Sequence, residues 1–319
     1  MQSILMTKES SAFFELRSKG DMNNIEEITK AVKKAGATRV LVQIPAGLKT
    51  KADEIATAIE KNGTEVIVSA SPMYGACDLA DKEAKQAGCD LLVHIGHSKF
   101  YVDFKTEVPV IYYPWEYDVK LENVDFSAIN EKRIGLVTTI QHMKLLKDVS
   151  VILKKSDKEA VIGGQILGCW FANATKIEDK VDAFLFVGSG RFHPLGIKTD
   201  KPLYSLDIER NEVQKIDAML FEKKRFANIY NAKNAASFAI LVSTKEGQRN
   251  LIGRAEEIKK QLQQKDKKAF IVIMDEINDA TLQGVKVDAY VNTACPRLAD
   301  DAFSKPFVNA SDINILLEE

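Results

Sequence analysis

The sequence contains no apolar run long enough to cross a membrane and no excess of charge of either sign. Its hydrophobic stretches fall short of the roughly 18 residues that a spanning helix needs, and it lacks the basic start and apolar core of a secretory signal. The 44 basic and 45 acidic residues leave a net charge of -1, which argues against a protein that coats nucleic acid or an anionic membrane. We therefore expect a cytoplasmic protein that binds neither a membrane nor nucleic acid directly.

Two further absences narrow the chemistry. Neither Gly163-Gly164 nor Gly188-Ser189-Gly190 belongs to a glycine pattern that cradles nucleotide phosphates, so an enzyme that depends on NAD or ATP is not expected. The cysteines are few and none forms the CxxC pair typical of structural zinc: Cys77, Cys89, Cys169 and Cys295. Because disulfides are uncommon inside the cell, these thiols are expected to serve metal binding, catalysis or burial.

What the sequence does contain is one pattern repeated three times. An apolar run opened by aspartate begins at Asp90, Asp182 and Asp288, at intervals of 92 and then 106 residues. A proline opens another short apolar run about 19 residues after each aspartate, and two β-branched runs precede it. Helical stretches lie between these runs, for example Lys49 to Lys61, which ends at a capping glycine, and Arg249 to Gln264. With 45% hydrophobic residues, the chain can bury a sizeable core.

The repeat predicts an α/β fold. Runs without polar alternation are typical of parallel strands buried on both faces, and right-handed crossovers would make each repeat a small parallel sheet flanked by helices. We expect three similar parallel-sheet α/β domains with pseudo-threefold symmetry around a central cleft, over residues 1–125, 126–225 and 226–319. One large doubly wound domain with accidental similarities is the alternative.

Three of the cysteines occupy related places in the repeats. Cys77 and Cys169 each lie 13 residues before the aspartate of their repeat, after its second strand, whereas Asp275 occupies this offset in the third repeat. Cys295 follows the third strand of the third repeat instead. Ligand sites in such sheets form beyond the carboxyl ends of the strands, and a helix that follows should favour the thiolate.

If the strand ends face inward, the three thiolates can converge on one centre. Three sulfurs suit an iron-sulfur cluster, or a zinc ion with one open position. Cys89 precedes its strand at the opposite edge of the sheet and is expected to be structural.

The contexts of these cysteines, together with Val40–Lys49, Val187–Pro194 and Ser243–Gln248, resemble the archaeal diphthamide synthase radical enzymes over nearly the whole chain. The resemblance implies a homodimer in which Cys77, Cys169 and Cys295 hold a 4Fe-4S cluster whose open iron binds S-adenosylmethionine. It also implies transfer of the 3-amino-3-carboxypropyl group to a histidine of translation elongation factor 2 by a radical route, the first step of diphthamide biosynthesis. Such a reaction requires an electron donor.

Other residues at the carboxyl ends of strands are candidate contacts for the cofactor. Arg191 could pair with a carboxylate, and glycines beside it would let the backbone approach a ligand. The full set of candidates is Gly188, Ser189, Gly190, Arg191, His193, Gln141, His142, Lys245, Gly247 and Gln248. His94 is expected in the core, and His97, at the offset that Cys295 occupies, can face the cleft without an assigned role. Trp115 is expected in the core or at a dimer contact.

Two rival functions stay open from the sequence. Quinolinate synthase is also a three-repeat protein with an open 4Fe-4S cluster, used there as a Lewis acid in dehydration. The segments Gly190–Pro194 and Thr293–Arg297 differ from it. The second rival is a non-catalytic supporting subunit of the same fold, which would not need a cysteine in every repeat.

Overall fold

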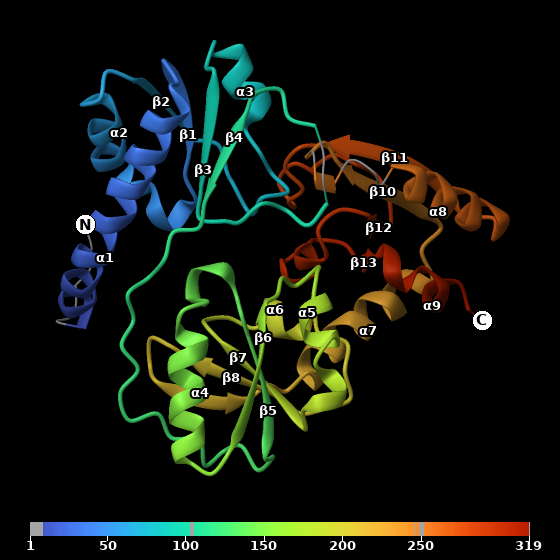
Figure 1. Ribbon diagram of the computed structural model, residues 1–319. Coiled ribbons are helices and arrows are strands. Elements are labelled where there is room, and N and C mark those ends of the chain that lie inside the picture. The colour runs from blue at the N-terminus through green and yellow to red at the C-terminus, as the bar shows by residue number, and fades with distance from the viewer. Residues whose placement is uncertain (1–8, 103–104, 246, 249–251, 319) are drawn as a thin grey trace, which may run out of the picture.

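Each repeat folds into its own β-sheet in the computed structural model, which describes residues 9–102, 105–245, 247–248 and 252–318 (Figure 1). The first sheet is fully parallel, with the strand order β2-β1-β3-β4. Its strands are β1 (Arg39–Gln43), β2 (Glu65–Ser69), β3 (Leu91–Ile95) and β4 (Val110–Tyr113). The helices of this unit are α1 (Glu9–Ala35), η1 (Ala46–Lys51), α2 (Ala52–Glu60) and α3 (Asp81–Gln86). Gly63, with φ of 82°, donates to Glu60 just beyond α2, as the expected cap requires.

The second unit differs from the prediction at one edge. Its strands are β5 (Arg133–Thr138), β6 (Glu159–Gln165), β7 (Ala183–Val187), β8 (Leu203–Asp207) and β9 (Glu212–Lys215), in the order β6-β5-β7-β8-β9. The first four are parallel, but β9 returns antiparallel to β8 through a tight turn in which Asn211 has φ of 55°. A wholly parallel sheet was therefore the wrong expectation here. The helical segments are η2 (Ile140–His142), α4 (Leu145–Lys155), α5 (Ala172–Thr175), η3 (Glu178–Lys180) and α6 (Phe192–Leu195).

The third unit again has a fully parallel sheet, in the order β11-β10-β12-β13. Its strands are β10 (Ser237–Ser243), β11 (Lys268–Met274), β12 (Ala289–Asn292) and β13 (Phe307–Asn309). Its helical segments are α7 (Met219–Lys233), α8 (Ile252–Gln264), η5 (Pro296–Asp300), η6 (Ala310–Asp312) and α9 (Ile313–Leu317). The predicted start of α8, residues 249–251, lies outside the described residues.

The segments near both predicted boundaries pack against the unit that follows them. Residues 225 and 226 lie within α7, whose Ile229 and Ala232 are buried in the core of the third unit. Val124 packs in the core of the second unit with Phe126. The connecting segments therefore join the sheet that follows them, because their apolar side chains are buried there.

The repeated aspartates have a structural role at the amino ends of the sheets. Asp90 accepts a hydrogen bond from the backbone of Thr38 (2.8 Å), and Asp288 accepts one from Ser237 (2.8 Å). Asp182 similarly accepts from Arg133 at 3.0 Å. Each carboxylate thus fixes the start of the first strand of its unit against the third strand. The opposite, carboxyl ends of the strands remain for the site.

Both faces of each sheet carry a buried apolar cluster, as the unbroken apolar runs predict. Trp115 is fully buried in the first unit, which agrees with the core interpretation. The expected fold class, three α/β units grouped around a shared centre, is confirmed (Figure 1). Among the described residues, no helix has the length and apolar character needed to span a membrane.

Candidate active site

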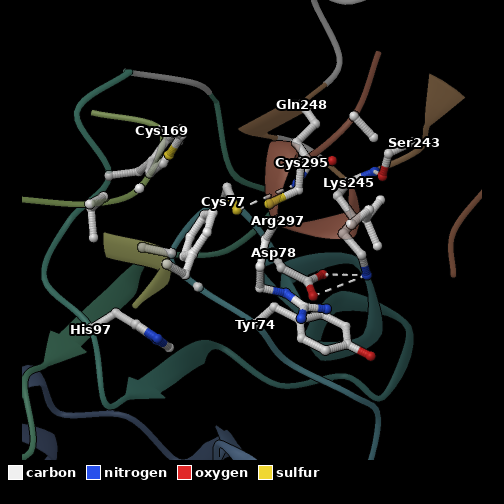
Figure 2. Close-up of a pocket in the computed structure, with 18 of the residues that line it drawn as sticks. Tyr74, Cys77, Asp78, His97, Cys169, Ser243, Lys245, Gln248, Cys295 and Arg297 are labelled. Atoms are coloured by element: carbon white, nitrogen blue, oxygen red, sulfur yellow. Dashed lines mark hydrogen bonds and ion pairs between the residues drawn. The ribbon is translucent and has the colours of Figure 1, made fainter. Parts of the chain in front are cut away.

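One cavity of about 240 Å³ lies where the three units meet. Segments that follow β2, β3, β6, β10 and β12 line it, so the carboxyl ends of strands from all three sheets contribute. Cys77 comes from the first unit, Cys169 from the second and Cys295 from the third, and all three line this cavity (Figure 2). Residues separated by 92 and 126 positions therefore meet at one place, as the pseudo-threefold arrangement predicts.

Burial raises the pKa of all three thiols at this meeting point. The pKa of Cys77 is raised to about 11, chiefly by burial and to a smaller extent by the neighbouring Cys295. Burial also raises the pKa of Cys169, where Cys77 adds to the effect, and of Cys295, where Cys169 does. The expected stabilisation of thiolates by a following helix was wrong, since α3 begins four residues after Cys77 and α5 has a single turn.

Three thiols in one cavity are a donor set that a 4Fe-4S cluster would accept, with its fourth iron left open. Within the described part of the chain, no three histidine, cysteine or acidic side chains lie close enough together to hold one metal ion. Cys89, by contrast, is buried in the apolar core of the first unit, far from this edge of the sheet.

The turn that carries Cys77 is held from the third unit. Gly247 donates its backbone N–H to the Cys77 carbonyl at 3.0 Å, and Gln248 Nε2 lies 3.7 Å from Cys77 Sγ. A Cβ atom on Gly247 would lie 2.5 Å from Cys77 Cα, so only glycine permits this approach. Gly247 does not line the cavity, and it acts on the Cys77 turn instead. Glu246 lies outside the described residues.

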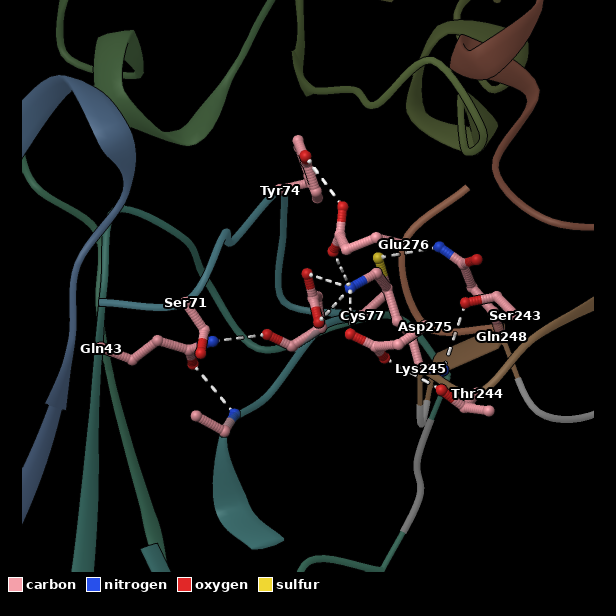
Figure 3. Close-up of polar contacts among 12 residues, drawn as sticks. Gln43, Ser71, Tyr74, Cys77, Ser243, Thr244, Lys245, Gln248, Asp275 and Glu276 are labelled. Carbon is pink, nitrogen blue, oxygen red and sulfur yellow. Dashed lines mark hydrogen bonds and ion pairs between the residues drawn. The ribbon is translucent and has the colours of Figure 1, made fainter. Parts of the chain in front are cut away.

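A buried ion cluster reinforces the same contact (Figure 3). Lys245 Nζ, with its side chain 9% exposed, lies 3.0 Å from Asp78 and 2.8 Å from Glu276. Burial opposes protonation, yet hydrogen bonds and charge from Glu276 and Asp78 raise the pKa of Lys245. Tyr74 donates to Glu276 at 3.1 Å and so joins the first unit to the third. Lys245 lines the cavity and joins the third unit to the first through its ion pair with Asp78.

The sequence reasoning missed several side chains that line the cavity. Arg297 lies over the Tyr74 ring at 5.9 Å and forms a two-pronged ion pair with Asp301, at 3.1 and 3.0 Å. Thr244 donates to Asp275 at 2.9 Å. Their positions in the sequence could have indicated these residues. Tyr74 and Arg297 lie close to Cys77 and Cys295, and Asp275 occupies in the third repeat the offset that Cys77 and Cys169 occupy in the other two.

The glycine turn after β7 lies outside the lining of the cavity. Gly188 and Gly190 have φ of 148° and 84°, which shapes the turn, whereas Ser189 and Arg191 are exposed. The chain reaches the cavity with Phe192 and His193, in α6. His142 also lies outside the lining; its ring packs on Tyr117, and burial lowers its pKa to about 4. Gly188, Ser189, Gly190, Arg191, His142 and Gly247 are therefore not among the residues that line the cavity, and their role as cofactor contacts stays a prediction.

Four of the candidate contacts do line the cavity: Gln141, His193, Lys245 and Gln248. Gln141 Nε2 donates to the Gly96 carbonyl at 2.5 Å, which ties the second unit to the first. His97, to which the sequence assigns no role, also lines the cavity and is hydrogen-bonded to the buried His94. Burial lowers the pKa of His97 and of His193 to about 4, so both rings are neutral near pH 7.

Comparison with known proteins places this site in a family. Residues 44–319 match the family model described as "Putative diphthamide synthesis protein". The chain is 37% identical to the 2-(3-amino-3-carboxypropyl)histidine synthase of Pyrococcus horikoshii, over 91% of this chain and 89% of that one. It is 28% identical to the synthase of Methanocaldococcus jannaschii, over 98% and 93% of the two chains.

Solved structures agree in fold. The crystal structure of Dph2 from Pyrococcus horikoshii superposes with a TM-score of 0.83 at 36% identity, covering 92% of this chain and 91% of that one. A second structure, of Dph2 with a 4Fe-4S cluster, gives the same score over 90% of its chain. The chain therefore belongs to the family of diphthamide synthesis proteins.

Proposed function

We propose that this protein is a 2-(3-amino-3-carboxypropyl)histidine synthase, which transfers the 3-amino-3-carboxypropyl group of S-adenosylmethionine to a histidine of translation elongation factor 2. The observation that carries the proposal is the meeting of Cys77, Cys169 and Cys295, one from each unit, in one cavity. A relative of the same fold contains a 4Fe-4S cluster, and the two archaeal relatives described above bear the name of the synthase.

When bound, the cluster supplies an open iron and the electron that cleaves the carbon–sulfur bond of the sulfonium. The residues of the chain hold the cysteine ligands in place and orient the substrate. Gly247 and Gln248 fix the Cys77 turn, and Lys245 locks it to the third unit through Asp78. We propose Gln141, Lys245 and Gln248 as contacts for S-adenosylmethionine, since all three line the cavity. Enclosure by three units orients the substrate and limits access of water to the radical.

The remaining partners are part of the proposal. The natural target is translation elongation factor 2, the active form is a homodimer, and a separate one-electron donor reduces the cluster. Of the two rival functions, quinolinate synthase is disfavoured, because the matched family and the relatives described above are named for diphthamide synthesis. A supporting subunit without catalysis would have no use for three cysteines arranged around a shared cavity.

The decisive experiment is anaerobic incubation of the iron-loaded protein with dithionite, S-adenosylmethionine and archaeal elongation factor 2. We expect methylthioadenosine as the nucleoside product and a target histidine heavier by one 3-amino-3-carboxypropyl group, detected by mass spectrometry. Deoxyadenosine as the main product, or no turnover by a fully loaded protein, would contradict the proposal.

Substitutions test the ligand assignment separately. Cys77→Ala, Cys169→Ala and Cys295→Ala should each lower bound iron and sulfide by more than about half, because a cubane with two protein ligands is held weakly. Cys89→Ala is the matched control, since this buried thiol lies in the apolar core and should leave iron content unchanged. Full iron loading in any of the first three variants, or loss of iron in the control, would overturn the assignment.

A further inference from the structure

A chain of three buried polar side chains leads from the first sheet to the cavity. Gln43, on β1, donates from Nε2 to the Asp78 carbonyl at 2.8 Å, and its Oε1 accepts from the Ala80 backbone N–H at 3.2 Å. A carbonyl can only accept and a backbone N–H can only donate, so these two contacts fix which end of the Gln43 amide is oxygen. Gln43 is 2% exposed, so its amide is held by these protein contacts.

The fixed amide determines the tautomers of two histidines. His94 Nδ1 lies 2.8 Å from Gln43 Oε1 and must carry the hydrogen, since that oxygen only accepts. The neutral ring then has a lone pair at Nε2, which faces His97 Nδ1 at 3.1 Å. His97 Nδ1 must therefore be the donor of this bond, and His97 Nε2 retains the lone pair.

A different contact sets the opposite tautomer in His193. Its Nδ1 accepts the backbone N–H of Gly168 at 3.2 Å, so the hydrogen of the neutral ring resides on Nε2. His97 and His193 come from different units, line the same cavity and are close enough for the charge of one to influence the other. The cavity lining therefore contains one imidazole whose Nε2 is an acceptor and one whose Nε2–H is a donor.

A neutral imidazole has an acceptor nitrogen next to C2. If that nitrogen accepts from His193 Nε2, the hydrogen on C2 is left to face the lone pair of His97 Nε2. We propose that His97 and His193 form the subsite for the imidazole ring of the target histidine, in which His97 Nε2 is the base that receives the proton lost from that ring. The inference rests on the proposed function and deepens it. His94 and Gln43 are positioning residues, because they act only by holding the tautomer of His97.

The proton and electron balance requires such a base. The new carbon–carbon bond joins C2 of the target imidazole to the transferred carbon, and C2 must then lose one proton and one electron to restore the aromatic ring. The proton passes to His97 Nε2. The electron returns to the oxidised cluster from which the cleavage of the carbon–sulfur bond took one, so the sum of the steps needs no other oxidant. A positioned general base contributes roughly 100-fold or more to such a step.

The first test uses His97→Asn, which retains a hydrogen-bonding group toward His94 and removes the ring. Iron content and methylthioadenosine formation are measured on the same variant without the target protein, so that any effect on the cluster or on cleavage is divided out of the transfer rate. Transfer to elongation factor 2 should fall roughly 100-fold. With a target deuterated at C2 of its histidine, the ratio of protonated to deuterated rates should rise in the variant, as proton loss becomes limiting.

These measurements distinguish failure of the imidazole subsite from failure of the proposed function. Unchanged transfer in His97→Asn, or equal loss of cleavage and transfer, would overturn the imidazole subsite. Absence of cleavage by the loaded wild-type protein would instead contradict the proposed function.

The second test does not depend on turnover. The chain has only four histidines, so the full-length protein labelled with 15N in its imidazole rings should give four resolvable ring systems in long-range 1H–15N correlation spectra. We expect the hydrogen on Nδ1 of His97 and on Nε2 of His193. The His97→Asn spectrum assigns the signals by the loss of one ring. A hydrogen on Nε2 of His97 would refute the inference.

Discussion

At Gly247, the absence of a side chain lets the third unit contact the turn that carries Cys77. Gly247→Ala places a methyl group against Cys77 Cα, so the turn must shift. We expect less than half of the wild-type iron content and a loss of roughly 1–3 kcal/mol of unfolding free energy. Iron analysis and urea unfolding measure the two effects.

Gly253→Ala is the matched control for that change. Gly253 is exposed on α8 and an added Cβ would meet no atom within 4 Å. This variant should keep full iron content, and alanine should stabilise the helix by up to about 1 kcal/mol. Normal iron content in Gly247→Ala would show that the close approach is dispensable.

Acid should destabilise the fold through its buried histidines. Burial lowers the pKa of His94 to about 3, while the unfolded chain has the ordinary value near 6.5. Between these two values the unfolded state binds a proton that the folded state refuses, so stability is lost as pH falls below about 6.5. For His94 alone, the loss at pH 5 is roughly 2 kcal/mol.

Urea unfolding at pH 7 and pH 5 checks this contribution. In His94→Asn the difference between the two pH values should be smaller by roughly 2 kcal/mol, because the titrating ring is gone. An equal difference in both proteins would mean that His94 is protonated in the folded state.

At the scale of elements, the segment between the second and third sheets, which contains α7, packs in the core of the third unit. Ile229 is 2% exposed in the third core, whereas the adjacent Tyr230 is 73% exposed. Ile229→Ala should cost about 2–4 kcal/mol, and Tyr230→Ala less than about 0.5 kcal/mol. Hydrogen exchange should accelerate in β10 to β13 for Ile229→Ala and stay unchanged in β5 to β8. Faster exchange in β5 to β8 instead would assign α7 to the second unit.

At the scale of the whole molecule, the three units are joined by few but specific contacts. Lys245→Met leaves Asp78 and Glu276 without their cation in a buried place, which should cost roughly 3 kcal/mol and loosen the first unit from the third. Lys245→Arg should restore part of that loss. Thermal unfolding and limited proteolysis between the units measure the change.

The control for Lys245 is another ion pair between units that lies in solvent. Lys144 pairs with Glu116, and its side chain is 80% exposed. Lys144→Met should therefore change stability by less than about 1 kcal/mol, since exposed pairs contribute little. Equal effects of the two substitutions would show that burial of Lys245 is unimportant.

The sequence by itself determined the parallel strands of each unit and the three-unit plan, though not the antiparallel β9, because each run is apolar on both faces and each aspartate repeats at a fixed place beside it. It also singled out Cys77 and Cys169, which share one offset in the repeat, and Cys295, which follows the third strand of its repeat. These features are local or periodic, so they can be read along one dimension.

Only the tertiary structure decided which side chains share the cavity. The turn Gly188 to Arg191 follows a strand end and yet lies outside the lining, whereas Tyr74 and Glu276, 202 residues apart, form a hydrogen bond. The tautomer of His97 likewise depends on Gln43, which lies 54 positions away in the sequence and is connected to His97 by two hydrogen bonds through His94. Loop direction and contacts between units arise from packing in three dimensions, for which the sequence contains no periodic signal.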